Sequence, residues 1–266
     1  NLPLFYYRQH GKNLTNNEGR LLKTRSQIMD KVNYKKDPII KFKTIAVIPI
    51  RGDLVETNAL ALRKLGNKTV LDWTIEATLN AKNITNILVT STDNNIKEHL
   101  KSKYGNKVHF FNRSWKLALI NDSLDETLTS LFSKIPTKLR DFEKICLLSI
   151  EYPFKKSYSI DMAIDALDIF NTNVVYGVRQ TDDLFFKHHG KGLKPLNKSN
   201  YIKKEENNIF KSCGGIFVFK RGFYFKDLMQ MEKLGHIEID EIGAFRISSN
   251  KSWEIAKTIS KNKDLI

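Results

Sequence analysis

Short apolar runs alternate with stretches of helical periodicity from residue 44 onward. A run such as TIAVIPI at 44–50 has no polar face, which is typical of a strand buried on both sides of a sheet. Strands that alternate with helices predict an α/β fold with a mostly parallel, doubly wound sheet. The expected strands are 44–50, 87–92, 108–111, 144–150, 173–178 and 214–219. The expected helices lie at 69–82, after Asp93, after Ser123, at 158–170 and at 253–259.

Two of these helices carry capping signals at their start. Asp93 is expected to cap the helix in which Ile96 and Leu100 share a face. Ser123 and Glu126 have the spacing of a capping box. The apolar face after that box comprises Leu124, Leu128, Leu131 and Phe132. Both helices are therefore expected to pack one face on the sheet.

Basic residues outnumber acidic ones, which gives a formal net charge of +15. Residues 1–44 hold ten Lys or Arg and three Asp or Glu, and the other lysines are scattered. Because a nucleic-acid surface clusters basic side chains with interleaved aromatics, no specific nucleic-acid partner is expected. The charge instead favours attraction for anionic nucleotides or membrane surfaces. No apolar run approaches the ~18 residues of a membrane span, so no transmembrane segment is expected.

The chain divides into three expected regions. Residues 1–30 form a polar, basic tail, residues 31–43 a lysine-rich linker, and residues 44–266 the α/β domain. The two cysteines, Cys146 and Cys213, each lie in an apolar stretch of that domain. This favours buried reduced thiols over a disulfide or a metal site, and it predicts a cytoplasmic protein.

The segment 45–79, IAVIPIRGDLVETNALALRKLGNKTVLDWTIEATL, resembles the opening of the acylneuraminate cytidylyltransferase family. In that family a strand ending in Pro-Ala-Arg is followed by a Gly-Ser-Lys loop, a Lys-Asn pair, Leu-Gly-Gly-Lys-Pro and a helix with Thr-Ile-Glu-Ala. The matching positions are Pro49, Arg51, Gly52, Leu65, Gly66, Lys68 and 74–77. Later matches, in the same order as in the family, are 91–93, Arg113, Ala118, Asp161, 215–217 and 245–256. The likeness covers about 44–260.

This resemblance implies a nucleotide-diphospho-sugar transferase fold, which is GT-A-like. It also implies an enzyme that activates an acid sugar of the sialic acid type with CTP and Mg²⁺ for surface glycan synthesis. In the family, the anomeric hydroxyl of the sugar attacks the α-phosphate and pyrophosphate leaves.

Ligands of a doubly wound sheet bind beyond the carboxyl ends of its strands, so the loop after the first strand is the first candidate site. Arg51 is a candidate partner for a phosphate or a base edge, with a salt bridge at the strand end as the alternative. Gly52 and Asp53 continue this nucleotide-binding loop. Asp53 favours a turn over a metal ligand because a carboxylate repels phosphate. Arg113 is a further anion-binding candidate, with a solvated surface arginine as the alternative.

Several positions that carry the family's chemistry hold other residues, including the turn 149–155, which replaces Gln-Pro-Thr-Ser-Pro-Leu-Arg. The others are Leu54 and Val55 for the loop serine and lysine, Leu60 and Ala61 for the Lys-Asn pair, and Arg246 and Ser248 for two metal-binding aspartates. Each change in the site is expected to cost on the order of 10²–10³ in rate. The substitutions therefore predict impaired catalysis.

Glu238 and Asp240 are candidate metal ligands because they lie two residues apart in HIEIDEI. In a strand, both carboxylates would point the same way and could hold a divalent cation. A charged edge strand is the favoured alternative.

Residues 2–15, LPLFYYRQHGKNLT, resemble the close of family-2 glycosyltransferases, which often end with a Tyr-Arg-x-His run and a short basic helix. This likeness, with a first residue other than Met, predicts an upstream glycosyltransferase domain; a disordered basic leader is the alternative.

Three readings of the function remain at this point. They are an active cytidylyltransferase, a non-catalytic relative that binds a nucleotide, a sugar or a neighbouring transferase, and a GT-A glycosyltransferase. The last normally needs an Asp-x-Asp triplet after a central strand, and the chain has none. Ancestry favours the first reading, and the substitutions favour the second.

Overall fold

The computed structural model describes residues 43–52, 60–119, 124–181, 183–196, 209–230 and 234–262. The tail 1–30 and all but the last residue of the linker 31–43 lie outside these ranges, so the expectations placed on them stay predictions. Within the described ranges, no helix is both long and apolar enough to cross a membrane.

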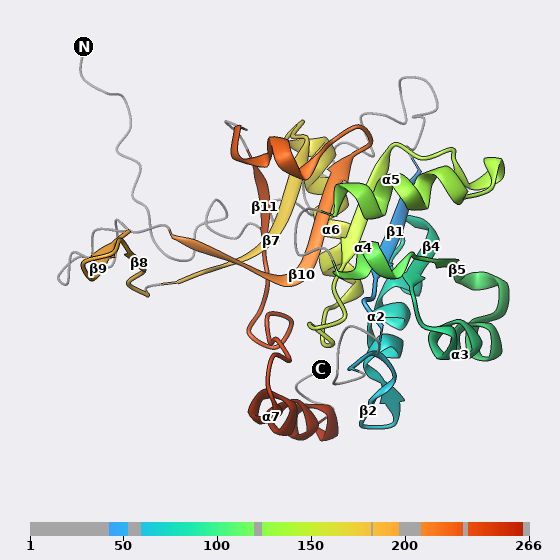
Figure 1. Ribbon diagram of the computed structural model, residues 1–266, viewed down its shortest axis with the longest axis horizontal. Coiled ribbons are helices and arrows are strands. Elements are labelled where there is room, and N and C mark those ends of the chain that lie inside the picture. The colour runs from blue at the N-terminus through green and yellow to red at the C-terminus, as the bar shows by residue number, and fades with distance from the viewer. Residues whose placement is uncertain are drawn as a thin grey trace, which may run out of the picture.

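A seven-stranded sheet forms the centre of the fold, with strand order β11-β7-β10-β6-β1-β4-β5 (Figure 1). Its strands are β1 (Thr44–Pro49), β4 (Ile84–Ser91), β5 (His109–Asn112), β6 (Lys144–Leu148), β7 (Val174–Gln180), β10 (Phe210–Lys220) and β11 (Gly235–Glu238). Neighbouring strands pair in parallel except at β10, which runs antiparallel to both β6 and β7. The prediction of a mostly parallel, doubly wound sheet is confirmed.

Helices cover both faces of this sheet, which explains why β1 is apolar on both sides. Ala46 and Ile48 belong to one core cluster with residues of α2, α3, α6 and α7, whereas Ile45 and Val47 belong to a second cluster with residues of α5. The helices are α2 (Val70–Leu79), α3 (Asn94–Tyr104), α4 (Trp115–Leu119), α5 (Asp125–Lys134), α6 (Ser157–Ile169) and α7 (Asn250–Lys261). Short 3-10 segments lie at η2 (Leu60–Leu62), η3 (Gly105–Lys107), η4 (Thr137–Leu139) and η5 (Phe225–Gln230).

The helix starts confirm one capping prediction and leave the other untested. Asp93 caps α3, and its side chain accepts a hydrogen bond from the backbone N–H of Asn95 at 2.8 Å. Leu124 is the N-cap of α5, and its side chain makes no capping hydrogen bond, whereas the predicted capping box begins at Ser123 and stays a prediction. Ser123 itself lies outside the described residues. Asp125 instead accepts a hydrogen bond from the backbone N–H of Phe225 at 2.8 Å, which ties α5 to the segment after β10.

Two small hairpins stand apart from the main sheet, and the sequence patterns predicted neither. β2 (Lys64–Leu65) and β3 (Lys68–Thr69) precede α2. β8 (Phe186–His188) and β9 (Leu193–Pro195) form a hairpin that reaches away from the body of the domain (Figure 1).

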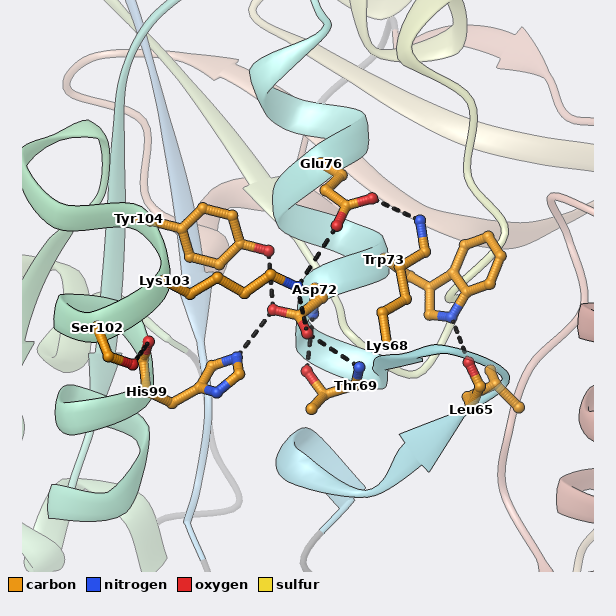
Figure 2. Close-up of polar contacts among 10 residues, drawn as sticks. All are labelled: Leu65, Lys68, Thr69, Asp72, Trp73, Glu76, His99, Ser102, Lys103 and Tyr104. Atoms are coloured by element: carbon orange, nitrogen blue, oxygen red, sulfur yellow. Dashed lines mark hydrogen bonds and ion pairs between the residues drawn. The ribbon is translucent and has the colours of Figure 1, made fainter.

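Asp72 is the centre of a buried polar network between α2 and α3 (Figure 2). Its carboxylate accepts hydrogen bonds from the Thr69 backbone N–H at 2.9 Å, from His99 Nε2 at 2.8 Å and from the Tyr104 hydroxyl at 2.8 Å. Lys103 Nζ lies 2.9 Å from its second oxygen. Burial alone would raise the pKa of Asp72, but these partners outweigh burial and hold the pKa well below its usual value. Asp72 is therefore charged at neutral pH and fastens the start of α2 to α3.

Candidate functional site

A cavity of about 490 Å³ lies above the carboxyl ends of β1 and β6. Arg51 after β1, residues 149–152 after β6 and the irregular stretch of β10 border it. Arg113 after β5, Glu126 of α5 and Arg246 before α7 also line it. This is the place where the topology of a doubly wound sheet predicts a ligand.

The end of β1 brings Arg51 to this cavity. The backbone oxygen of Arg51 accepts a hydrogen bond from the Thr92 hydroxyl at 3.0 Å. Gly52 has a φ of +84°, and a Cβ at this position would lie 2.7 Å from Thr92 Oγ1, so both its conformation and its close approach require glycine. The Arg51 side chain is exposed and forms no ion pair with any described residue, so the predicted strand-end salt bridge is not found there. Asp53 lies outside the described residues.

Arg113 lies beside Arg51 but is only 6% exposed. Its Nη2 donates to the backbone oxygen of Ile50 at 2.7 Å, and its backbone N–H donates to that of Ser91 at 2.9 Å. Nε of Arg113 is buried and has no hydrogen-bond partner among the described residues. Burial, with the nearby charge of Arg51, lowers the pKa of Arg113 to about 10, so the guanidinium is still charged at neutral pH. The alternative of a solvated surface arginine is wrong, and the two guanidiniums make this part of the cavity positive.

An ion pair joins the turn after β6 to the segment before α7. Arg246 Nη2 lies 2.6 Å from Glu151 Oε2, and Arg246 Nε donates to the same oxygen at 2.6 Å. The hydrogen bond to Glu151 raises the pKa of Arg246. The backbone N–H of Ser248 donates to Ser252 Oγ at 2.9 Å, at the start of α7. The two positions that resemble metal-binding aspartates thus hold a paired guanidinium and a serine at a helix start.

Other positions of the resemblance face away from the cavity. Leu60 and Ala61, which stand where the family has Lys-Asn, are buried in the core cluster beneath α2. Lys68 Nζ of β3 lies 2.6 Å from Glu76 Oε2 of α2 (Figure 2). None of these four residues lines the cavity.

The two candidate metal ligands, Glu238 and Asp240, lie at the end of the edge strand β11 and just beyond it. Glu238 is the last residue of the edge strand β11, whereas Asp240 lies in the turn beyond it. Asp240 accepts a hydrogen bond from the Gly243 backbone N–H at 2.8 Å, and its other oxygen lies 3.3 Å from both Lys156 Nζ and the Tyr158 hydroxyl. Burial alone would raise the pKa of Asp240, but these partners lower it. Asp240 is therefore already engaged by its own neighbours, and the described part of the chain contains no group of three His, Cys, Asp or Glu that could hold a metal ion.

Comparison with known families decides the ancestry of the chain. The family model for cytidylyltransferases matches residues 57–189, which is half of the chain. The chain belongs to the cytidylyltransferase family. No curated protein matches this cytidylyltransferase in sequence.

Solved structures of other cytidylyltransferases share its fold. A 4-diphosphocytidyl-2C-methyl-D-erythritol synthase from Anaerococcus prevotii superposes with a TM-score of 0.64 at 13% identity, over 84% of this chain and 98% of that one. A CMP:2-keto-3-deoxy-manno-octonic acid synthetase complexed with CTP gives a TM-score of 0.59 at 12% identity, over 82% and 98% of the two chains. Both likenesses confirm the predicted α/β fold.

Sequence reasoning missed three features of the cytidylyltransferase cavity. Glu126 was assigned to a capping box, although its position lines the cavity. The pairing of Glu151 with Arg246 joins residues too far apart in the chain for any local pattern to reveal. Lys155, beneath the turn after β6, is 5% exposed, and the sequence Tyr-Pro-Phe-Lys-Lys does not distinguish it from the more exposed Lys156 beside it.

Proposed function

We propose that this cytidylyltransferase domain binds CTP or a close relative in the cavity above β1 and β6, and that its nucleotidyl transfer to an acid sugar is impaired. The observation that carries the proposal is the pair Arg51 and Arg113, which line one cavity and have no carboxylate partner among the described residues. Guanidinium groups bind phosphate oxygens through charge-assisted hydrogen bonds. Because a buried donor without an acceptor is costly, Arg113 Nε favours a ligand oxygen at this place.

Nucleotidyl transfer from CTP to a sugar, the reaction of the family, determines which groups the site would have to bind. The anomeric hydroxyl of the sugar attacks the α-phosphorus of CTP, and the bond from that phosphorus to the pyrophosphate oxygen breaks. Arg51 and Arg113 would bind and orient the phosphates in this scheme. The acid sugar of the sialic acid type, and a role in surface glycan synthesis, follow from the resemblance of 44–260 and belong to the proposal.

The residues present do not fit Mg²⁺ at the position that the resemblance implies. A divalent cation bound to a triphosphate neutralises charge and polarises the phosphoryl oxygens. Arg246 places a second cation at that position, and the nearby carboxylate of Glu151 is already paired with it. No step of the transfer is therefore assigned to a metal. The poor fit of Mg²⁺ to these residues is one support for impaired catalysis.

Replacing Arg51 by alanine is expected to weaken CTP binding by about tenfold or more, because a hydrogen bond to a charged group contributes about 1.5–3 kcal/mol. Isothermal titration calorimetry measures this effect. Arg179→Ala is the matched control, since Arg179 is paired with Glu241 and does not line the cavity. Mg²⁺ is expected to raise CTP affinity by less than tenfold. Unchanged affinity in Arg51→Ala, or a tenfold or greater gain with Mg²⁺, would contradict the proposed site.

A second candidate function is docking to a glycosyltransferase domain of the same polypeptide. The likeness of residues 2–15 to the close of family-2 glycosyltransferases favours it, as does the Lys-rich segment 31–43 that follows. A tethered domain acts at high effective concentration without turnover of its own.

The two free, buried cysteines are consistent with the proposed cytoplasmic location.

If this docking role holds, the gene encodes a glycosyltransferase domain directly before Asn1, and deleting 44–266 lowers the activity or the solubility of that transferase. Sequencing the upstream coding region and assaying the truncated protein measure both parts. An unrelated upstream domain, or a transferase unaffected by the deletion, would exclude docking while leaving CTP binding to be judged by calorimetry.

A further inference from the structure

Lys155 is a buried cation that the proposed function does not use. Its side chain lies beneath the turn that follows β6, and the residue is 5% exposed. Nζ donates to the backbone oxygen of Ser149 at 2.8 Å, to Thr74 Oγ1 of α2 at 3.0 Å, and to the backbone oxygen of Tyr152. The three hydrogens of an ammonium thus meet three acceptors, none of which carries a charge.

No carboxylate within the described ranges lies at ion-pair distance from Lys155 Nζ. The titratable group that faces it is the Cys146 thiol of β6, and burial raises the pKa of Cys146 so that the thiol stays neutral. Asp161 of α6 influences Cys146, but its carboxylate accepts hydrogen bonds from the backbone N–H groups of Lys82 and Asn83 at 3.0 and 2.9 Å. Burial without an opposite charge lowers the pKa of Lys155 to about 7. The lysine therefore changes charge near neutral pH.

The two backbone oxygens that Lys155 binds belong to the cavity wall, which we define as residues 149–152. The Ser149 backbone N–H donates to the Gly215 oxygen at 3.0 Å, and the Glu151 oxygen accepts from the Ile247 N–H at 2.8 Å. The wall is therefore held by β10 and by the segment before α7 on its outer sides, and by Lys155 from beneath. A Cβ at Gly215 would lie 2.7 Å from Tyr152 Cδ2, so the wall and β10 are in close contact.

We propose that the protonated side chain of Lys155 is a positioning residue that holds the cavity wall 149–152 in its ligand-binding conformation, so that ligand binding and protonation of this lysine are coupled. This inference rests on the proposed nucleotide site. A neutral amine has two hydrogens for three acceptors, so one backbone oxygen loses its partner when the proton leaves. Ligand binding favours the protonated form, and affinity is therefore full below about pH 7 and falls as the pH rises above it.

The test measures CTP binding by calorimetry from pH 6.5 to 8.5 in the wild type, Lys155→Met and Lys156→Met. The neighbouring Lys156 pairs with Asp240 outside the cavity, which makes it the matched control. Wild type and Lys156→Met are expected to lose about tenfold in affinity across this range, whereas Lys155→Met binds weakly at every pH. Titrations in buffers of different ionisation enthalpy should also show uptake of a proton near pH 7.5 in the first two proteins and a smaller uptake in Lys155→Met. Comparison between variants removes the contribution from ionisation of CTP itself.

A second variant covers the case in which Lys155→Met fails to fold. Thr74→Val removes one acceptor of Nζ at nearly constant volume, and it is expected to shift the midpoint of the affinity profile downward by roughly one pH unit. Equal pH profiles in wild type and Thr74→Val, or in wild type and a folded Lys155→Met, would overturn the proposal.

A ligand-independent measurement separates this inference from the proposed function. Cys213 lines the cavity at the edge of the wall, whereas Cys146 is fully buried. At one fixed pH of 6.5, a thiol reagent is expected to modify Cys213 about tenfold faster in Lys155→Met than in wild type or Lys156→Met, because the wall is looser. If CTP binds no variant but Cys213 follows this order, the nucleotide proposal fails and the role of Lys155 stands. If CTP binds but Cys213 reacts equally in all three proteins and the affinity profiles coincide, the role of Lys155 fails alone.

Discussion

Replacing Asp72 by alanine is expected to lower the free energy of unfolding by about 3–4 kcal/mol, a large share of the stability of a single domain. The carboxylate is 2% exposed and is the common acceptor for Thr69, His99 and Tyr104. Its removal leaves the buried Thr69 N–H and the partly buried donors of His99 and Tyr104 without this partner, and it also removes the capping box of α2. Lys103 is 38% exposed and can turn to water, so it adds little to the loss. Equilibrium urea unfolding followed by circular dichroism measures the change.

Two comparisons sharpen this prediction. Glu254→Ala removes an exposed pair with Lys257 and should leave stability unchanged; an Asp72→Ala variant as stable as this control would show that the network contributes nothing. Asp72→Asn tests the charge itself. Because the folded state depresses the pKa of Asp72, its contribution is complete above the unfolded value of about 3.9 and is lost as the pH falls through the lower folded value. The stability gap between wild type and Asp72→Asn should therefore be constant from pH 7 to about pH 5 and should narrow below about pH 4.

Nucleotidyl transfer by this domain is expected to be at least about 10⁴-fold slower than transfer by an active CMP-sugar synthetase. Two separate losses combine in this figure, each on the order of 10²–10³. Leu60 and Ala61 are packed into the core where the family presents a lysine and an asparagine. Arg246 is paired with Glu151 where the family presents a metal carboxylate.

Pyrophosphate release from CTP measures this rate, with sialic acid, Kdo or legionaminic acid as the acceptor and an active synthetase as the positive control. CTP binding to the same preparation by calorimetry shows that the cavity is intact. Release at rates typical of the family, with any of these sugars, would refute impaired catalysis and leave the family assignment untouched.

Strands and helices were predictable wherever burial imposes a local pattern. The run at 44–50 became β1 because a central strand buries both faces, and Asp93 capped α3 because an N-cap needs only the next few residues. The antiparallel direction of β10 was not predictable, since an apolar strand reads the same in either direction. The hydrogen bond that Asp125 accepts from Phe225 was not predictable either, because this tertiary contact lies beyond the reach of local spacing.

The candidate site was predictable only where the chain is locally constrained. Arg51 follows a buried strand, and the topology of the sheet alone directs it to the cavity. Burial of Arg113 depends on its hydrogen bond to Ile50, which comes from a different strand end. The end of β11 at Glu238, before Asp240, was not predictable because boundaries of short strands are weakly encoded.

The position of β10 has a consequence for the synthesis of this protein. β10 fills the gap between β6 and β7, yet it is translated after both. Until residues 210–220 have left the ribosome, β6 and β7 each lack the neighbour that β10 later supplies, and open strand edges pair readily with other chains. β10 then closes the facing edges of β6 and β7 in one event, whereas the other edge of β7 stays open until β11 has also been made.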